Sequence, residues 1–209
     1  MKILIVEDNL ILQKSVCILM DCWGFDFDVA NNGQEAVERV ALNEGKYDLC
    51  LMDIDMPIMN GYEAALALRR DFSYFPIMAL SGKASIEETY VKAGMDDYLE
   101  KPCNPDSLLD KINELTIKSL KIGFKSNGIY FTKEMPRDAE ELSELRELAK
   151  KDLALLIVEG NKQRFVVHEN IQNKMSCILA TKLPLTPEQF EAQLKEEDSD
   201  IGNYFSIVE

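Results

Sequence analysis

Acidic side chains occur in two places along the chain where they could bind a metal ion. Glu7 and Asp8 follow the apolar run of residues 3–6, and Asp53 follows the apolar run of residues 49–52. Each run is typical of a buried strand, and open α/β sheets form their ligand sites at the carboxyl ends of such strands. Three carboxylates that converge there cannot all remain ionised without a cation. Because oxygen ligands with no nearby His or Cys suit a hard ion, these residues predict Mg²⁺ before Zn²⁺.

Two further polar residues follow later apolar runs. Ser81 ends the run of residues 76–81, and Lys101 follows the run of residues 97–100. In a parallel sheet, both side chains would project toward the edge that carries the carboxylates, and cis or turn geometry at Lys101-Pro102 would fix the chain there. A hydroxyl donor and an ammonium group beside a carboxylate-bound Mg²⁺ suit a phosphoryl group, whose charge the metal and the lysine would neutralise together.

The elements that must position these residues alternate between short apolar runs and helical patterns up to about residue 120. We expect strands at residues 2–6, 25–30, 47–53, 76–81 and 97–100, with helices between them. A capping box at residues 85–88 and the pair Asn104-Pro105 predict helix starts, while Gly24, Gly45 and Gly94 predict helix ends. This alternation predicts a doubly wound five-stranded parallel sheet, covered on both faces, over residues 1–120.

The pattern changes over residues 121–209, which we expect to form a second, smaller α+β domain. An Asn-Gly turn predicts a hairpin at residues 124–131 with Phe124 opposite Phe131. A helix is expected over 137–151, followed by a second hairpin over 153–168 that turns at Gly160-Asn161. Residues 170–183 fit either a helix or a strand, and a capping box at Thr186 predicts a short final helix.

Charge and composition exclude several classes of protein. Residues 1–119 carry 11 Lys and Arg against 21 Asp and Glu, and residues 120–209 carry 12 against 16, so the two parts have net charges of -10 and -4. Neither part offers the basic surface that tight binding to a polyanion needs. No apolar stretch approaches membrane-spanning length and the first residues lack a signal-peptide pattern, so we expect a cytoplasmic protein that binds no membrane. The five cysteines show no spacing typical of a disulfide framework or a zinc site.

Residues 1 to about 119 resemble the receiver domain of two-component response regulators, which has a flavodoxin-like fold. The resemblance depends on four segments that occur in order at the expected strand ends, and together they are highly specific. These segments are Val6-Glu7-Asp8-Asn9, Met52-Asp53-Ile54-Asp55-Met56-Pro57-Ile58-Met59-Asn60-Gly61, Ala79-Leu80-Ser81-Gly82 and Asp97-Tyr98-Leu99-Glu100-Lys101-Pro102.

The resemblance implies that Asp53 accepts a phosphoryl group from a histidine of a sensor histidine kinase or phosphotransfer protein. Glu7 and Asp8 would hold Mg²⁺ together with Asp53 and the backbone carbonyl of Asp55. The chain would then be a phosphoprotein of a phosphorelay and a signalling module rather than an enzyme.

The same resemblance gives roles to further residues. Ser81 and Lys101 would bind the phosphoryl oxygens, and Tyr98 would be the aromatic switch that turns inward on activation together with Ser81. The side chains of Asp55 and Lys83 would tune the lifetime of the phosphoryl group. Taken alone, Tyr98 is more typical of a half-buried packing residue than of a switch.

The second domain matches no output type with a recognisable sequence pattern, so its function stays open. The favoured hypothesis is a module that signals through protein contacts, in which phosphorylation changes a surface near Tyr98 and alters homodimerisation or the docking of another protein. A transcription regulator with an unfamiliar DNA-binding fold is the alternative, disfavoured by the charge of residues 120–209. A phosphorelay role for His168, the only histidine, is disfavoured because it ends an expected strand rather than lying on a helix.

Overall fold

The computed structural model describes residues 1–82, 87–125, 128–151, 154–159, 162–168 and 205–208. The chain divides into two compact units, the first of which comprises Met1–Thr116 and Arg137–Ala139. The second unit comprises Ile117–Pro136 and Glu140–Glu209. Each unit is considered by itself.

A five-stranded parallel sheet forms the centre of the first unit, as the alternating pattern predicted. Its strands are β1 (Lys2–Val6), β2 (Asp26–Ala30), β3 (Leu49–Asp53), β4 (Ile77–Ser81) and β5 (Asp97–Glu100), in the order β2-β1-β3-β4-β5. All residues of β3 and β4 are buried, which explains why these strands read as continuous apolar runs rather than as alternating ones. The strand order reverses direction at β1 and β3, and the crevice at such a point is where open α/β sheets bind ligands.

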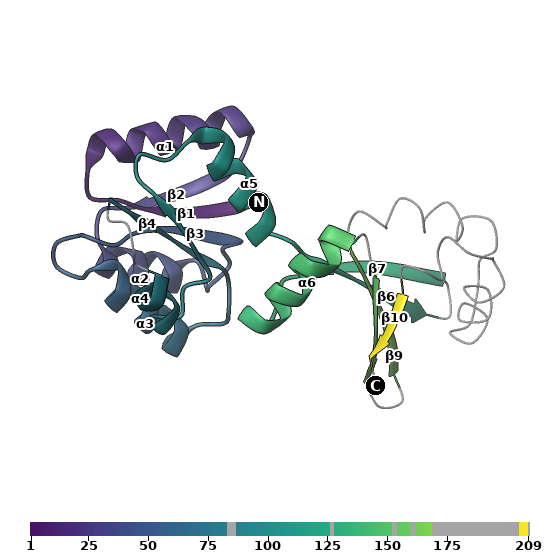
Figure 1. Ribbon diagram of the computed structural model, residues 1–209. Helices are drawn as coiled ribbons and strands as arrows, with labels where there is room; N and C mark the ends of the chain where they lie inside the picture. The colour runs from purple at the N-terminus through teal and green to yellow at the C-terminus, as the bar shows by residue number, and fades with distance from the viewer. Residues whose placement is uncertain (83–86, 126–127, 152–153, 160–161, 169–204, 209) are drawn as a thin grey trace. The chain divides into compact units, whose positions relative to one another are not determined.

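Five helices cover the two faces of this sheet. They are α1 (Leu10–Trp23), α2 (Gly33–Leu42), α3 (Gly61–Asp71), α4 (Glu87–Lys92) and α5 (Pro105–Leu115). Figure 1 shows α1 and α5 on one face and α2, α3 and α4 on the other. Leu4 and Val6 of β1 pack in one cluster with Ala36 of α2 and Ala64 of α3, so the sheet and these helices share a core.

Short polar residues and glycines set the ends of these helices. The Asn104 side chain accepts hydrogen bonds from the backbone N–H groups of Asp106 and Ser107, and Pro105 follows it at the first helical position, as predicted. Gly24 ends α1 with a φ of 73°, a left-handed conformation that glycine adopts without a Cβ clash. The predicted capping box of α4 lies partly outside the described residues, because the description resumes at residue 87.

The second unit contains a mixed sheet of five described strands in the order β10-β8-β9-β6-β7. These are β6 (Ser119–Lys125), β7 (Gly128–Glu134), β8 (Ala154–Glu159), β9 (Lys162–His168) and β10 (Phe205–Val208), and α6 (Ala139–Lys151) lies between β7 and β8 in the chain. The predicted hairpin of β8 and β9 is confirmed by the pairing of Glu159 with Lys162. His168 ends β9, as expected from the sequence.

The predicted register of the first hairpin is wrong. Phe124 pairs with Ile129, and Phe131 pairs with Ile122. Pairing continues to Lys125 and Gly128, so Gly128 belongs to β7 rather than to the predicted turn. An Asn-Gly pair indicates a turn, but here the strand pairing extends one residue further on the glycine side. The expectations for residues 160–161, 170–183 and the helix from Thr186 lie outside the described residues.

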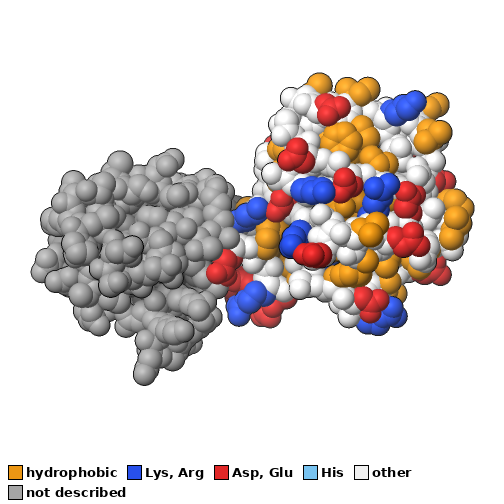
Figure 2. Space-filling model, turned by 180° about the vertical axis from the view of Figure 1, so that it is seen from behind, with side chains coloured by type: hydrophobic (Ala, Val, Ile, Leu, Met, Phe, Trp, Pro, Cys, Tyr) orange, Lys and Arg blue, Asp and Glu red, His pale blue; other side chains and the backbone are white. Residues whose placement is uncertain are grey.

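Two surface properties bear on the classes of partner. Within the described part of the chain, no helix is both long and apolar enough to cross a membrane. On the face of the first unit seen in Figure 2, Lys and Arg side chains are interspersed with Asp and Glu and do not form one basic area. This distribution agrees with the net charge of -10 over residues 1–119.

A buried ion pair ties α3 to the amino ends of β4 and β5. The Arg69 guanidinium bonds to Asp96 Oδ2 at 2.7 Å and also donates to the backbone carbonyls of Phe75 and Gly94. Asp96 accepts further hydrogen bonds from the Tyr74 hydroxyl and from the backbone N–H of Ile77. Only 2% of the Asp96 side chain is exposed, so this ion pair with Arg69 is a buried one.

Replacing this arginine should destabilise the fold strongly. Arg69→Met is expected to lower the free energy of unfolding by about 3–5 kcal/mol, because it removes one partner of a buried ion pair and two hydrogen bonds to backbone carbonyls. The matched control is Arg70→Met in the same helix, whose ion pair with Asp71 is exposed and should contribute little. Urea unfolding of both variants measures the difference, and equal midpoints would contradict the assignment.

Candidate functional site

The carboxyl ends of neighbouring strands bring the acidic residues singled out in the sequence together. Glu7 and Asp8 follow β1 directly, and Asp53 is the last residue of β3. One carboxylate oxygen from each of the three lies within 4.8 Å of the others. Glu7 and Asp53 are buried, whereas Asp8 is exposed, so the cluster is accessible to solvent on one side.

Lys101 joins this cluster from the end of β5. Its ammonium Nζ lies 2.8 Å from Asp53 Oδ1 and 2.5 Å from Glu7 Oε2. The backbone N–H of Lys101 donates to the Ser81 carbonyl at 2.8 Å, which holds the ends of β4 and β5 side by side. Ser81 is itself buried at the last position of β4. The structure therefore places all the residues with predicted phosphoryl contacts at one edge of the sheet.

Burial and charge act against each other at this cluster. Burial raises the pKa of Glu7, while the hydrogen bond and the charge of Lys101 counteract that rise. For Lys101, burial alone would lower the pKa, but its hydrogen bonds and ion pairs with Asp53 and Glu7 outweigh burial and raise it. The lysine is therefore held as a cation beside two buried carboxylates, and one positive charge faces three acidic groups.

The donor set of the cluster fits Mg²⁺. Its ligand atoms are all carboxylate oxygens, and the open side at Asp8 leaves room for the waters that Mg²⁺ keeps when it binds to a protein. Asp55 lies two residues after Asp53 with an exposed side chain, in the loop that contains the carbonyl expected to complete the ligand set. Asp48 lies before the amino end of β3 and accepts a hydrogen bond from the Lys2 backbone N–H at 2.7 Å, whereas the carboxylate cluster lies at the carboxyl end of that strand.

Tyr98 lies on β5 and is half-buried rather than part of the carboxylate cluster. Its ring centroid is 5.3 Å from that of Tyr90 on α4, and both rings pack against the core of the first unit. The position is compatible with a packing role and with a switch role. Lys83, expected to tune the lifetime of the phosphoryl group, lies outside the described residues.

Two glycines lie in close contact with the loop after Asp53. The sequence alone assigned neither of them a role. Gly61 opens α3 behind the Asn60–Glu63 capping box, and a Cβ at this position would lie 2.2 Å from the Asp53 carbonyl oxygen. Gly33 opens α2, where a Cβ would lie 2.6 Å from the Met59 carbonyl oxygen. Both helices thus start in close contact with the backbone of the segment that runs from Asp53 to Met59, an approach that only glycine permits. The capping box was the sequence signal that could have identified Gly61 as the first residue of a helix.

A methyl group at position 61 should therefore disturb Asp53. Gly61→Ala is expected to lower stability by roughly 1–3 kcal/mol, because the new Cβ forces backbone apart in a packed region. Gly82→Ala is the matched control, because a Cβ there would meet nothing within 4 Å although Gly82 directly follows Ser81. Thermal unfolding of the two variants tests this, and a Gly61→Ala protein as stable as Gly82→Ala would show that the loop adjusts freely.

Comparison with known sequences gives one consistent result. The response regulator receiver domain family matches residues 3–113. Hybrid signal transduction histidine kinase I of Dictyostelium discoideum is 35% identical over 137 residues, which cover 61% of this chain and 8% of that protein. The cell cycle response regulator CtrA of Brucella ovis is 31% identical over 121 residues, covering 57% of this chain and 51% of CtrA. The chain thus spans about half or less of the length of these relatives.

Solved structures agree with the sequence matches over the first unit. The chemotaxis protein CheY4 of Vibrio cholerae is 27% identical with a TM-score of 0.51, and the match covers 55% of this chain and 97% of CheY4. A co-crystal structure from Saccharomyces cerevisiae, of the histidine phosphotransfer protein Ypd1 with the receiver domain of its downstream response regulator Ssk1, matches with 33% identity and a TM-score of 0.50. That match covers 56% of this chain and 88% of the matched chain.

Proposed function

Because the chain belongs to the response regulator receiver domain family through residues 3–113, we propose that Asp53 is its phosphoacceptor and that Glu7, Asp8 and Asp53 hold Mg²⁺. One observation carries this proposal. Asp53 is a buried carboxylate whose Oδ1 is bonded at 2.8 Å to a lysine, and two further carboxylates lie within 4.8 Å. A carboxylate oxygen placed beside fixed positive charge and a metal site can accept a phosphoryl group without further covalent chemistry from the protein.

The transfer itself exchanges one bond for another. A carboxylate oxygen of Asp53 forms a bond to phosphorus while the bond from phosphorus to the donor's imidazole nitrogen breaks, and that nitrogen keeps the electron pair. Lys101 and the Ser81 hydroxyl would bind the oxygens of the transferred group, and when bound, Mg²⁺ would neutralise further charge on them. Water later hydrolyses the acyl phosphate and restores the carboxylate. The side chains of Asp55 and Lys83 are proposed to tune that step, and Tyr98 is proposed to respond to it with Ser81.

The donor is proposed to be a protein that carries a phosphohistidine, either a sensor histidine kinase or a phosphotransfer protein. The yeast complex of Ypd1 with a receiver domain supports this kind of partner. Two segments that follow site residues in the chain expose large apolar side chains: Ile11 at the start of α1 is 77% exposed, and Ile58 in the loop after Asp53 is 83% exposed. A protein donor would cover them.

Ile11→Ser should slow transfer from a phosphohistidine protein but leave labelling by acetyl phosphate unchanged. Equal slowing of both reactions would count against a contact between Ile11 and a protein donor.

Labelling of the unaltered protein tests the proposal. Incubation with acetyl phosphate and Mg²⁺ should add one phosphoryl group, seen as a mass increase of the intact protein. Hydroxylamine should remove it, because an acyl phosphate is a mixed anhydride and phosphoserine or phosphothreonine is not. EDTA in excess over Mg²⁺ should prevent the labelling, because the carboxylate cluster then lacks its cation. A group that survives hydroxylamine, or labelling that persists in EDTA, would speak against an aspartyl phosphate at this site.

The second unit is proposed to signal through protein contacts, with phosphorylation altering dimerisation or the docking of another protein. Residues 120–209 carry a net charge of -4, which disfavours DNA as the target. Phosphorylation can shift the receiver between two states only as far as it interacts differently with them. A pull-down with the full chain, with and without acetyl phosphate, should recover a partner or a second copy in only one condition. Salt-sensitive binding of duplex DNA by the full chain would favour the alternative of a transcription regulator.

A further inference from the structure

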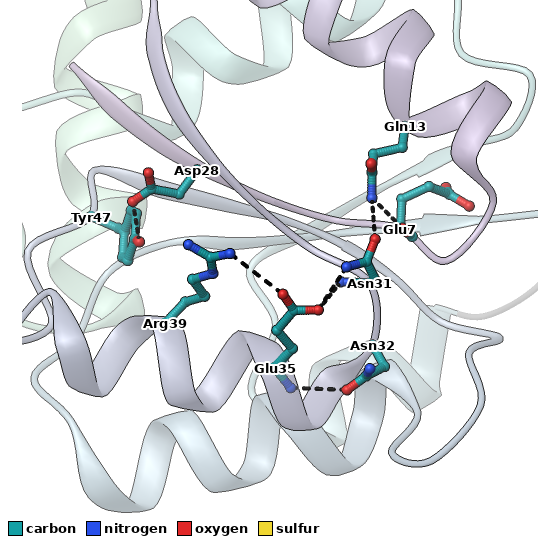
Figure 3. A network of polar contacts seen from close by, with 8 residues as sticks. All are labelled: Glu7, Gln13, Asp28, Asn31, Asn32, Glu35, Arg39 and Tyr47. Atoms are coloured by element: carbon teal, nitrogen blue, oxygen red, sulfur yellow. Dashed lines mark hydrogen bonds and ion pairs between the residues drawn. The ribbon is translucent and has the colours of Figure 1, made fainter.

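A glutamine on α1 links the acidic pair to the rest of the first unit. Gln13 is 8% exposed, and its side-chain nitrogen Nε2 donates two hydrogen bonds. One goes to the Glu7 backbone carbonyl at 2.8 Å and the other to Asn31 Oδ1 at 3.1 Å (Figure 3). A buried amide is costly unless it is hydrogen-bonded, so these two bonds determine where the Gln13 side chain can lie.

The bond to the Glu7 carbonyl acts on both proposed metal ligands of β1. That carbonyl belongs to the peptide group that joins Glu7 to Asp8, so its orientation sets the direction in which the chain enters Asp8. The Glu7 side chain is held separately, through the Asn9 backbone N–H at 3.1 Å and through Lys101. The Glu7 backbone N–H donates to Ala30 at 3.1 Å. These other contacts do not hold the peptide group between Glu7 and Asp8. Gln13 therefore fixes the orientation of that group.

Asn31, the second acceptor of the Gln13 amide, is itself held in place by hydrogen bonds. The backbone N–H and the side-chain amide of Asn31 both donate to Glu35 Oε2 at 2.8 Å, and Glu35 forms an ion pair with Arg39 on α2. The backbone N–H of Asn31 is the main reason that the pKa of Glu35 is lowered, so this carboxylate stays ionised as the acceptor. Figure 3 shows the contacts running from Glu7 through Gln13, Asn31 and Glu35 to Arg39.

We propose that Gln13 is a positioning residue for metal binding, which orients the Glu7–Asp8 peptide so that both carboxylates reach the same ion. The inference rests on the proposed function, because it concerns the Mg²⁺ site assigned there. Groups that hydrogen-bond to metal ligands typically change metal affinity by 10–100-fold when they are removed. Gln13 would change metal affinity through its hydrogen bond to the backbone carbonyl of Glu7, a proposed ligand.

Calorimetric titration of metal-free full-length protein with Mg²⁺, without a phosphodonor, tests the proposal. Gln13→Met keeps the length of the side chain but removes the donor, and it should raise the Kd for Mg²⁺ by about 10-fold or more. Gln34→Met is the control, because Gln34 is exposed on α2 and bonds only to Glu38 in the described structure. It should leave the Kd unchanged.

A second variant separates the effect of positioning from the effect of charge. Gln13→Glu keeps the shape of the side chain but adds a negative charge near the cluster, which by electrostatics alone would tighten Mg²⁺ binding. Loss of the hydrogen bond predicts weaker binding instead. Kd values for both Gln13 variants within about twofold of the unaltered protein, or tighter binding by Gln13→Glu, would overturn the inference. Absence of Mg²⁺ binding by the unaltered protein would contradict the metal site itself, a distinguishable result.

Discussion

Asp53→Asn protein incubated with acetyl phosphate and Mg²⁺ should gain no phosphoryl group, whereas the unaltered protein gains one. The amide has nearly the shape of the carboxylate but lacks the negatively charged oxygen that must attack phosphorus. It also gives up the ion pair of Asp53 Oδ1 with Lys101 Nζ at 2.8 Å, so the lysine would remain paired with Glu7. Intact-mass measurement after a fixed incubation gives the labelled fraction of each protein directly.

Two controls keep this result interpretable. Asp55→Asn changes a neighbouring exposed carboxylate by the same chemistry and should still be labelled. Thermal unfolding of Asp53→Asn should show a folded protein, since the substitution removes one of three crowded acidic groups. Undiminished labelling of folded Asp53→Asn would show that another residue receives the phosphoryl group.

Asp8→Ala should weaken Mg²⁺ binding by more than about 10-fold, because Asp8 is a proposed direct ligand and its loss should exceed the typical effect of losing an outer partner. Asp8 is the exposed member of the cluster, so its removal should leave the buried pair of Glu7 and Asp53 with Lys101 intact. Calorimetric titration of the two proteins with Mg²⁺ measures the change, and labelling by acetyl phosphate should fall with it.

Asp48→Ala is the matched control for this experiment. Asp48 precedes β3, whereas the cluster lies after it, so its carboxylate should not contribute to the metal site. Its loss removes a hydrogen bond from the Lys2 backbone N–H and should affect stability rather than Mg²⁺ affinity. If Asp48→Ala weakened Mg²⁺ binding more than Asp8→Ala did, the location of the metal site would be wrong.

The fold of the first unit could be predicted because its strands are buried on both faces. Runs such as residues 49–53 contain no polar residue until Asp53, so strand position and the place of the acidic side chain are read from the same pattern. The helix start at Asn104 was predictable for a local reason, since an Asn followed by Pro at the first helical position fixes a start within two residues. The register of β6 and β7 could not be predicted, because a turn signal alone does not decide how far strand pairing extends.

The parts of the site that escaped prediction depend on contacts between distant segments. A glutamine within an apolar helix gives no sign that it bonds to the Glu7 carbonyl and to Asn31, 18 residues away. The 2.2 Å approach of a Gly61 Cβ to the Asp53 carbonyl likewise arises only after α3 packs at the end of β3. By contrast, the sequence was enough to predict that four side chains would cluster, because parallel strands place all their carboxyl ends at one edge of the sheet. These residues are Glu7, Asp8, Asp53 and Lys101.

Borohydride reduction of the phosphorylated protein identifies the residue that carries the phosphoryl group. An aspartyl phosphate is an acyl phosphate, so reduction converts the modified aspartate to homoserine, which peptide mass spectrometry can locate. We expect homoserine at position 53 in protein treated with acetyl phosphate and Mg²⁺, and none in untreated protein. Homoserine at another acidic position, or a phosphoryl group found on His168 with none at Asp53, would contradict this expectation.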